Sequence, residues 1–381
     1  MSQRLHADAL RRLLQSEHIE TLSAPDLIRT FREDDGIAAF RPDGICQIDP
    51  RTGDRVLFNT SRARRPHDNR PPATPPSTFS PACAICRGDT TGILDVAALS
   101  EGFTFINKNL YPMLYPQETV IPHYLPENAS EHIGAQAKPA YGLHFLQWTS
   151  SFHDRDWHNM PLADCVVVMQ RLAALERRLL DLGPELLPGA SGGAAYVSII
   201  KNQGGLVGGS LAHGHQQIAF GSVMPGRVQD NRRFEQEQGE PFSAYLLREN
   251  PAEFAVSDYG PAVLLVPYFM RRPYDMMLLL KASNRRHLFE LDEDELAAVA
   301  RGWRDATAAI RRIMPQLGRE LAYNVIVHNG PGAGLYFEFL PYTQETGGFE
   351  HLGLYVCQGN PAEAAIHLQQ VLAQPRGEIT R

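Results

Sequence analysis

The sequence has no apolar run approaching the roughly 20 residues that a helix needs to span a bilayer. Its first eight residues also lack the apolar core of a secretory signal. Of its 381 residues, 43% are hydrophobic and 21% are charged, which is ordinary for a soluble protein. We therefore expect a cytoplasmic protein without a membrane partner, long enough for two compact domains or one large one.

A basic excess is missing as well. The 36 Lys and Arg residues are outnumbered by 43 Asp and Glu residues, so the formal net charge is −7. A nucleic-acid scaffold normally carries the opposite balance. We expect no nucleic-acid partner, and any phosphate ligand must be held by local basic residues.

Cysteine is too sparse and too scattered for a disulfide framework. The chain has five cysteines, Cys46, Cys83, Cys86, Cys165 and Cys357, and only Cys83 and Cys86 are close in sequence. A Cys-x-x-Cys pair in a cytosolic chain without a thioredoxin-like context is most simply half of a zinc site, which needs two further ligands. A redox pair is the alternative.

The sequence does contain a glycine-rich segment from Lys201 to Gln217, KNQGGLVGGSLAHGHQQ. Its glycines and Ser210 form a loop whose backbone N–H groups can approach an anion closely, because no Cβ is in the way. In an extended strand, His213, His215 and Gln217 would lie on one face. The segment therefore predicts a phosphate site with two imidazoles beside it.

Such a site is suited to nucleophilic chemistry at phosphorus. An imidazole beside a bound phosphate can form a phosphoramidate, which divides one displacement into two easier ones. Gln217 would donate an N–H group to the phosphate oxygens without supplying a proton. The alternative is a glycine-rich hairpin with two solvated histidines, but the Asn, Gly-Gly-Ser and Gln at fixed offsets favour the phosphate site.

The pattern Asn202-x-Gly204, Gly208-x-Ser210, His213-x-His215-x-Gln217 resembles the active-site segment of the histidine-triad superfamily in its transferase branch. That branch includes galactose-1-phosphate uridylyltransferase, ADP-glucose phosphorylase and diadenosine tetraphosphate phosphorylase. The resemblance covers about residues 50–370. It implies that His215 is the nucleophile, that Gln217 steadies the phosphoryl oxygens, and that the substrate phosphates are bound by Asn202, Gly208, Gly209 and Ser210.

The resemblance also assigns residues outside this segment. The run of arginines at 62–65 could be a solvated surface, but related enzymes carry a similar Arg-Ala-x-Arg-Pro whose arginines contact the donor phosphates. It therefore implies that Arg62 and Arg65 bind those phosphates, for which bidentate guanidinium groups are suited. Asn109 and Tyr111 would line the nucleotide pocket, with Asn107 as the alternative register.

For the metal, the resemblance places a zinc-binding His at the end of the strand expected at 142–148. His153 would be the third ligand, with His158 as its competitor, and His213 would be the fourth. Together with Cys83 and Cys86 they make a closed four-ligand sphere, the arrangement of a structural zinc. This zinc would fix the strand that carries His215.

The expected fold is α+β, with two histidine-triad-like repeats built on antiparallel sheets with packed helices. The first repeat is expected at 51–225 and a degenerate second one at 226–381, after an N-terminal extension at 1–50. Tyr196 stands six residues before Asn202, and Tyr323 stands six before Asn329, which favours a duplication. The second repeat lacks the paired histidines, so we expect one active site per chain.

These observations predict a nucleotidylyltransferase that works through a nucleotidyl-histidine. The first expectation is transfer from UDP-glucose to a hexose 1-phosphate. The alternative is an adenylyl-transferring phosphorylase that uses inorganic phosphate, with ADP-glucose, a diadenosine polyphosphate or adenylylsulfate as donor. A non-catalytic nucleotide sensor is the third hypothesis, which the intact His215 and Gln217 argue against. The resemblance also implies a homodimer.

Overall fold

The computed structural model describes residues 18–38, 40–42, 44–49, 52, 54–59, 61, 65, 78–88, 92–116, 138–188, 195–282 and 284–374. Among these residues no helix is both long and apolar enough to cross a membrane. The described part mixes helices with antiparallel sheet, so the predicted α+β class is confirmed.

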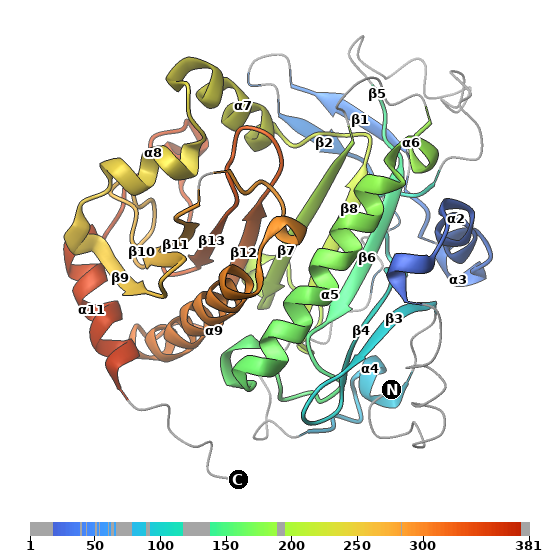
Figure 1. The fold of residues 1–381 in the computed structure, drawn as a ribbon, viewed down its shortest axis with the longest axis horizontal. Helices are drawn as coiled ribbons and strands as arrows, with labels where there is room; N and C mark the ends of the chain where they lie inside the picture. Colours follow the sequence, from blue (N-terminus) through green and yellow to red (C-terminus); the bar gives the residue numbers. More distant parts are fainter. Residues whose placement is uncertain are drawn as a thin grey trace.

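The centre of the molecule is one sheet of ten antiparallel strands (Figure 1). In their side-by-side order the strands are β3 (Ile93–Ala98), β4 (Phe103–Lys108), β6 (Gly142–Trp148), β8 (His215–Gly221), β7 (Tyr196–Gln203), β12 (Tyr323–His328), β13 (Tyr336–Pro341), β11 (Met276–Leu280), β10 (Ala262–Leu265) and β9 (Ala255–Asp258).

The strand order reads alike from either edge. In each half, three strands are followed along the chain by a long helix and then by two further strands, the first of which lies at the centre of the sheet. The halves join where β7 pairs with β12, with Ile200 opposite Ile326. The boundaries expected at 50/51 and 225/226 remain a prediction.

The expected equivalence of Tyr196 and Tyr323 is wrong. Side chains alternate between the faces of a strand, and the pairing places Tyr323 opposite Gln203. Tyr323 packs into the core between the sheet and the helices, whereas Tyr196, in register with Ile200, lines a pocket on the other face. Because two residues on opposite faces cannot occupy equivalent positions, the shared six-residue offset is a coincidence.

Two long helices, α5 (Leu162–Asp181) and α9 (Glu293–Gln316), cover one face of the sheet (Figure 1). Helix α9 begins with a capping box at Asp292, whose carboxylate accepts from the Glu295 N–H at 2.8 Å. Its Trp303 is fully buried and stacks on Trp157 with ring centroids 4.7 Å apart. Apolar side chains from both helices and both halves form one continuous core.

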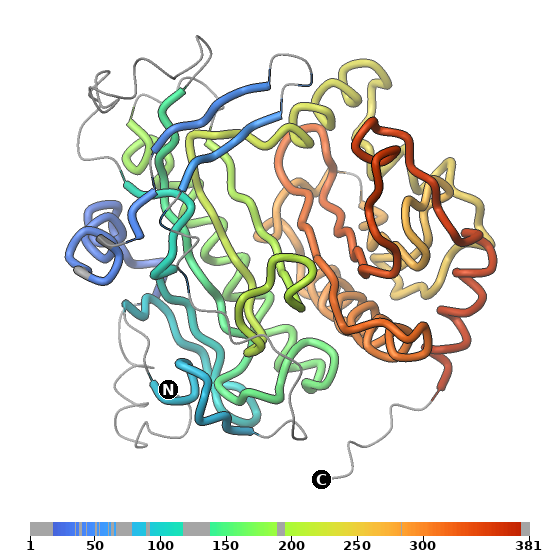
Figure 2. The backbone as a smooth tube through the Cα atoms, turned by 180° about the vertical axis from the view of Figure 1, so that it is seen from behind, coloured from blue at the N-terminus to red at the C-terminus, as the bar shows by residue number. Residues whose placement is uncertain are grey.

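The opposite face of the sheet is seen from behind in Figure 2. It is partly covered by α4 (Ala84–Arg87), α7 (Gly226–Gln238), α8 (Phe242–Glu249) and a small sheet of β2 (Arg55–Leu57), β1 (Ile45–Ile48) and β5 (Lys138–Pro139). The remaining helices are α2 (Ala24–Arg32), α3 (Asp35–Ala38), α6 (Gly183–Leu186), α10 (Gly348–His351) and α11 (Pro361–Ala373), with short 3-10 turns η1 (Ile19–Thr21), η3 (Trp157–Asn159), η4 (Gly205–Val207), η5 (Ala252–Phe254) and η6 (Leu288–Glu290).

Candidate active site and metal cluster

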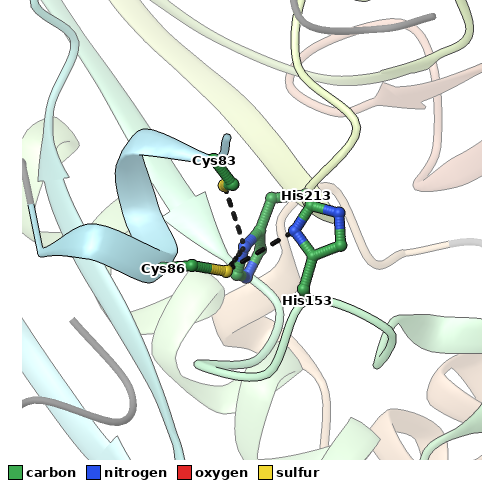
Figure 3. Close-up of side chains that lie close together, drawn as sticks. All are labelled: Cys83, Cys86, His153 and His213. Atoms are coloured by element: carbon green, nitrogen blue, oxygen red, sulfur yellow. Dashed lines mark hydrogen bonds between the residues drawn. The ribbon is translucent and has the colours of Figure 1, made fainter. Parts of the chain in front are cut away.

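Four predicted metal ligands, Cys83, Cys86, His153 and His213, lie together, with their ligand atoms all within 4.8 Å of one another (Figure 3). The two cysteines come from α4 and the residue before it, His153 follows β6, and His213 precedes β8. His158, the competitor for the third place, is not part of the cluster.

The spacing of the ligand atoms suits a tetrahedral ion. The Cys83 Sγ and Cys86 Sγ atoms lie 3.6 and 3.8 Å from His213 Nδ1, and Cys86 Sγ lies 3.6 Å from His153 Nδ1. Zinc bonds of the usual lengths would place such atoms roughly 3.3–3.8 Å apart. The hydrogen bond between the two thiols lowers the pKa of Cys86, against the opposing effect of burial, and raises the pKa of Cys83, so without a metal the pair favours one thiolate.

The orientation of His213 is fixed by its other ring nitrogen. Its Nε2 lies 2.8 Å from the carbonyl oxygen of Ser150, and because a carbonyl can only accept, Nε2 carries the proton. Nδ1 is then left with its lone pair facing the two sulfurs. Metal-binding histidines commonly have such a second hydrogen bond, which holds the ring in place.

His215 has the complementary arrangement. Its Nδ1 lies 2.8 Å from the His213 carbonyl oxygen, so Nδ1 carries the proton and Nε2 keeps its lone pair. Burial lowers the pKa of His215 to about 4, so the ring is neutral at physiological pH. The Trp148 ring packs against both imidazoles, with centroids 5.4 Å from His213 and 5.0 Å from His215.

The prediction that His213, His215 and Gln217 share one strand needs correction. Strand β8 begins at His215, and His213 lies in the bend before it. Gln217 follows His215 on the same face of β8, next to Ile200 of β7. Only His215 and Gln217 therefore share the strand, while His213, a predicted metal ligand, lies in the turn before it.

A buried ion pair lies beneath this turn. The Lys201 ammonium is fully buried, lies 2.8 Å from Asp156 Oδ2, and donates to the carbonyl oxygen of His215 at 3.3 Å. Burial raises the pKa of Asp156, but the Lys201 charge and the other neighbouring groups outweigh it, so the pKa lies at about 2. A Cβ at Gly214 would lie 2.6 Å from the Asp156 carboxyl carbon, so only glycine fits between the two histidines.

The glycine-rich loop is tightly folded. Gly204 and Gly208 have φ angles of +95° and +82°, and the loop is closed by hydrogen bonds from the Gly209 N–H to Gly204 O and from the Gly208 N–H to Gly205 O. A phosphate could take these two N–H groups only by competing with those bonds. Asn202 Oδ1 accepts from Asn324 Nδ2 at 2.7 Å, which ties the loop to β12.

Of the two arginines expected to bind phosphate, Arg62 lies outside the described residues. Arg65 reaches the glycine-rich loop, where its Nη2 donates to the carbonyl oxygen of Gly208 at 3.3 Å. Burial lowers the pKa of Arg65, but a guanidinium group remains charged at any physiological pH. The structure therefore brings one cation of the arginine run to the loop.

The residues expected in the nucleotide pocket make hydrogen bonds and packing contacts with other parts of the protein. The Asn109 side chain is buried, and its Oδ1 accepts from the Tyr111 N–H at 2.8 Å. The alternative, Asn107, accepts from Trp148 Nε1 at 2.8 Å. Tyr111 is partly buried and packs edge-to-face on Phe40, with centroids 4.4 Å apart. Asn109 thus shapes the turn that presents Tyr111.

Sequence reasoning missed three supporting side chains. His144 is buried on β6 and its Nδ1 accepts from the Met113 N–H at 3.0 Å. Gln216 accepts from Thr149 Oγ1 and Trp157 Nε1 at 2.9 and 3.1 Å on the helix-covered side of β8. Lys201 is the third. Gln216 was within reach of sequence analysis, because a polar residue between two predicted site residues must face the core.

No protein-family model matches the chain. The chain is 22% identical over 349 residues to an ADP-glucose phosphorylase of Arabidopsis thaliana, covering 85% of this chain and 92% of that protein. A solved uridylyltransferase superposes with a TM-score of 0.63 and 21% identity, covering 86% of this chain and 98% of that one. A solved ADP-glucose phosphorylase from Arabidopsis thaliana with bound ADP-glucose superposes with a TM-score of 0.57 and 19% identity, covering 85% and 98%.

These likenesses confirm the resemblance to the transferase branch of the histidine-triad superfamily and confirm its fold in this chain. Both named relatives span nearly their whole length in the comparison, so the shared architecture includes the second half as well as the half that carries His215.

Proposed function

We propose that the protein is a nucleotidylyltransferase that carries a nucleoside monophosphate on His215. The observation that carries this proposal is the tautomer of His215: its Nδ1–H bond to the His213 carbonyl leaves the Nε2 lone pair available as a nucleophile. The relatives are named ADP-glucose phosphorylase and uridylyltransferase, which supports the same reaction class.

In the first step His215 Nε2 attacks the α-phosphorus of the donor. The N–P bond forms as the bond from phosphorus to the bridging oxygen breaks, and the leaving phosphate departs with that electron pair. A phosphate oxygen of the acceptor then attacks the same phosphorus, and the lone pair returns to Nε2. Because both leaving groups are weak bases, neither step needs a strong general acid.

The remaining residues would bind the donor phosphates and orient them for attack. Ser210, Asn202 and Arg65 would hold the donor phosphates, and the N–H groups of Gly208 and Gly209 would join them by exchanging their loop-closing hydrogen bonds for phosphate oxygens. Gln217 would donate to the phosphoryl oxygens in both steps. Because phosphorus is attacked from one direction, the rigid placement of His215 contributes as much as its chemistry.

We infer that zinc is the ion of the Cys83, Cys86, His153 and His213 cluster. Two thiolates and two imidazoles are a donor set that zinc prefers, and a closed four-ligand sphere leaves no position for substrate. The ion would therefore hold α4, the loop after β6 and the turn before β8 together, and would take no part in the reaction.

Two donors fit the proposal. UDP-glucose with a hexose 1-phosphate acceptor agrees with the uridylyltransferase likeness. ADP-glucose with inorganic phosphate agrees with the ADP-glucose phosphorylase relative. The nucleotide trapped on the enzyme would distinguish them.

The test is incubation with UDP-glucose, ADP-glucose, diadenosine tetraphosphate and adenylylsulfate, followed by intact-mass detection and mapping of the adduct. We expect a uridylyl or adenylyl group on His215. His215→Ala should stay folded and metal-loaded without an adduct, whereas His213→Ala should lose metal and stability. Gln217→Ala should form the adduct slowly, and His18→Ala, a control at an exposed histidine, should behave as wild type. An adduct on any other residue would overturn the mechanism.

We also propose that the protein is a homodimer. The segment after β13 exposes five large apolar side chains, Phe349 (62% exposed), Leu352 (83%), Leu354 (60%), Tyr355 (46%) and Val356 (52%). Such a cluster on one short segment is typical of an interface. Light scattering should give a dimer mass that falls to the monomer in Leu352→Asp, and a monomeric wild type would contradict this proposal.

A further inference from the structure

A pocket of about 480 Å³ spans the junction of the two halves on the same sheet face as His215. Its floor is formed by residues of β7, β12, β13 and β11, and its rim by the start of α7, the loop before β11 and the segment after β13. Within the described residues, its lining includes neither His215 nor Gln217 nor any part of the glycine-rich loop. This is a separate cavity of the size that small molecules occupy.

Two acids inside the pocket have side-chain partners of their own. Glu338 Oε2 lies 2.7 Å from His328 Nε2, and both side chains are largely buried. Asp275 accepts from the Arg272 N–H at 3.1 Å, and its other oxygen lies 3.8 Å from Arg272 Nε. Burial raises the pKa of Asp275 to about 7, so its charge is only partial at neutral pH.

Two acids at the rim are committed as well. Glu345 forms an ion pair with Arg319. Glu350 accepts from the backbone N–H groups of Gly347 and Val356, at 2.8 and 3.2 Å. The carboxylates of the pocket therefore each have a partner that does not come from a ligand.

The arginines Arg227 and Arg271 are in a different situation. Within the described part of the chain neither forms an ion pair with a carboxylate, and Arg271 instead stacks over the Tyr355 ring at 4.6 Å. Arg227 and Arg271 both line the pocket, and the charges of both contribute to lowering the pKa of Glu338. Within the described residues neither guanidinium group hydrogen-bonds to a carboxylate, so an incoming phosphate would compete only with the longer-range attraction of Glu338 for their N–H donors.

We propose that this pocket binds a phosphate-bearing small molecule, with Arg227 and Arg271 as the phosphate ligands. The planar guanidinium group matches phosphate geometry, and two such groups from different elements can hold one phosphate between them. The walls supply Tyr196 and Phe269 as apolar surface for the rest of the molecule. The site is independent of the chemistry at His215 and does not rest on it.

Isothermal titration calorimetry with glucose 1-phosphate, AMP and inorganic phosphate tests this proposal. Glucose and adenosine serve as unphosphorylated counterparts. In the wild type we expect a phosphate-dependent site that Arg227→Gln and Arg271→Gln each weaken by about 10–100-fold, the usual size of a charge-assisted contact. The matched control is Arg233→Gln on the same helix, where Arg233 pairs with Asp230 at 2.8 Å and should be dispensable.

The outcomes are distinguishable from those of the proposed function. Binding that is equal in the wild type and both variants would overturn the pocket proposal, as would equal affinity for glucose and glucose 1-phosphate. A changed oligomeric state in the variants without any probe binding would show that the arginines serve a subunit contact instead. Both variants should still form the nucleotidyl adduct. A wild type that binds the probes here but forms no adduct would refute the enzyme proposal alone.

Discussion

The buried pair of Lys201 and Asp156 offers the sharpest test of how the catalytic turn is held. Asp156→Asn leaves a fully buried ammonium group without its counterion, and Lys201→Met leaves a carboxylate in the same position. The Lys201 ammonium also donates to the His215 carbonyl, so its loss releases the backbone beneath the nucleophile. We expect both single variants to lose stability and to turn over more slowly.

The size of the effect follows from burial. Lys201 is 0% and Asp156 9% exposed, and their charged atoms are 2.8 Å apart. Removing one partner of such a pair typically costs about 3–5 kcal/mol, because an uncompensated charge stays buried. The double variant Lys201→Met, Asp156→Asn leaves no buried charge and should lose less than the sum of the single variants.

The chain provides a matched control in Lys281 and Asp258, which are also 2.8 Å apart but 45% and 62% exposed. Asp258→Asn should cost less than about 1 kcal/mol, because water replaces the lost partner. Urea unfolding of the four variants and the wild type measures the differences as shifts in midpoint. If Asp156→Asn is no more destabilising than Asp258→Asn, or the double variant is fully additive, the argument for a coupled buried pair is refuted.

Three further predictions concern the metal, the arginine run and the pocket acid. Elemental analysis should find about one zinc per chain, and Cys83→Ser should lose both metal and thermal stability, whereas a metal-free and equally stable wild type would contradict the cluster. Arg65→Ala should lower kcat/KM for the donor by about 10–100-fold, since a charge-assisted contact is worth about 1.5–3 kcal/mol. Unchanged kinetics would show that Arg65 does not bind the donor phosphates. Burial raises the pKa of Asp275 from 3.8 to about 7. Between about pH 4 and 7 the folded state therefore binds more protons than the unfolded state, so the free energy of unfolding should fall as pH rises through this range. Asp275→Asn should flatten that slope in unfolding measured across pH, and an unchanged slope would show that another group causes it.

The metal cluster could be predicted because its ligands have distinctive residue types and spacing. The Cys-x-x-Cys spacing of Cys83 and Cys86 by itself indicates two ligands of a metal site. The family resemblance added His153 and His213. A strand with strong alternation was also within reach, since the strand expected at 142–148 is β6.

Other features depend on pairing across the sheet, which a single sequence does not display. A lysine that opens a glycine-rich loop gives no sign that it is buried, and its partner Asp156 lies 45 positions away in a polar stretch. The equal spacing of Tyr196 and Tyr323 from an asparagine wrongly suggested equivalent positions in the two halves. Only the register of β7 against β12 shows that their side chains lie on opposite faces of the sheet. Asn109 matched a motif, yet its contacts are those of a residue that shapes a turn.

The contact between Asn324 and Asn202 has a consequence for how the chain can change over time. Asn324 Nδ2 also donates to the carbonyl oxygen of Val207, at 3.2 Å, and a Cβ at Gly204 would lie 2.4 Å from the Leu321 carbonyl oxygen. The half without paired histidines therefore supplies contacts that hold the glycine-rich loop of the other half in shape. Substitutions in β12 are therefore constrained by a reaction in which that strand takes no chemical part. A fragment ending before residue 226 would keep every predicted catalytic residue but would lack the β12 contacts that hold the glycine-rich loop in shape.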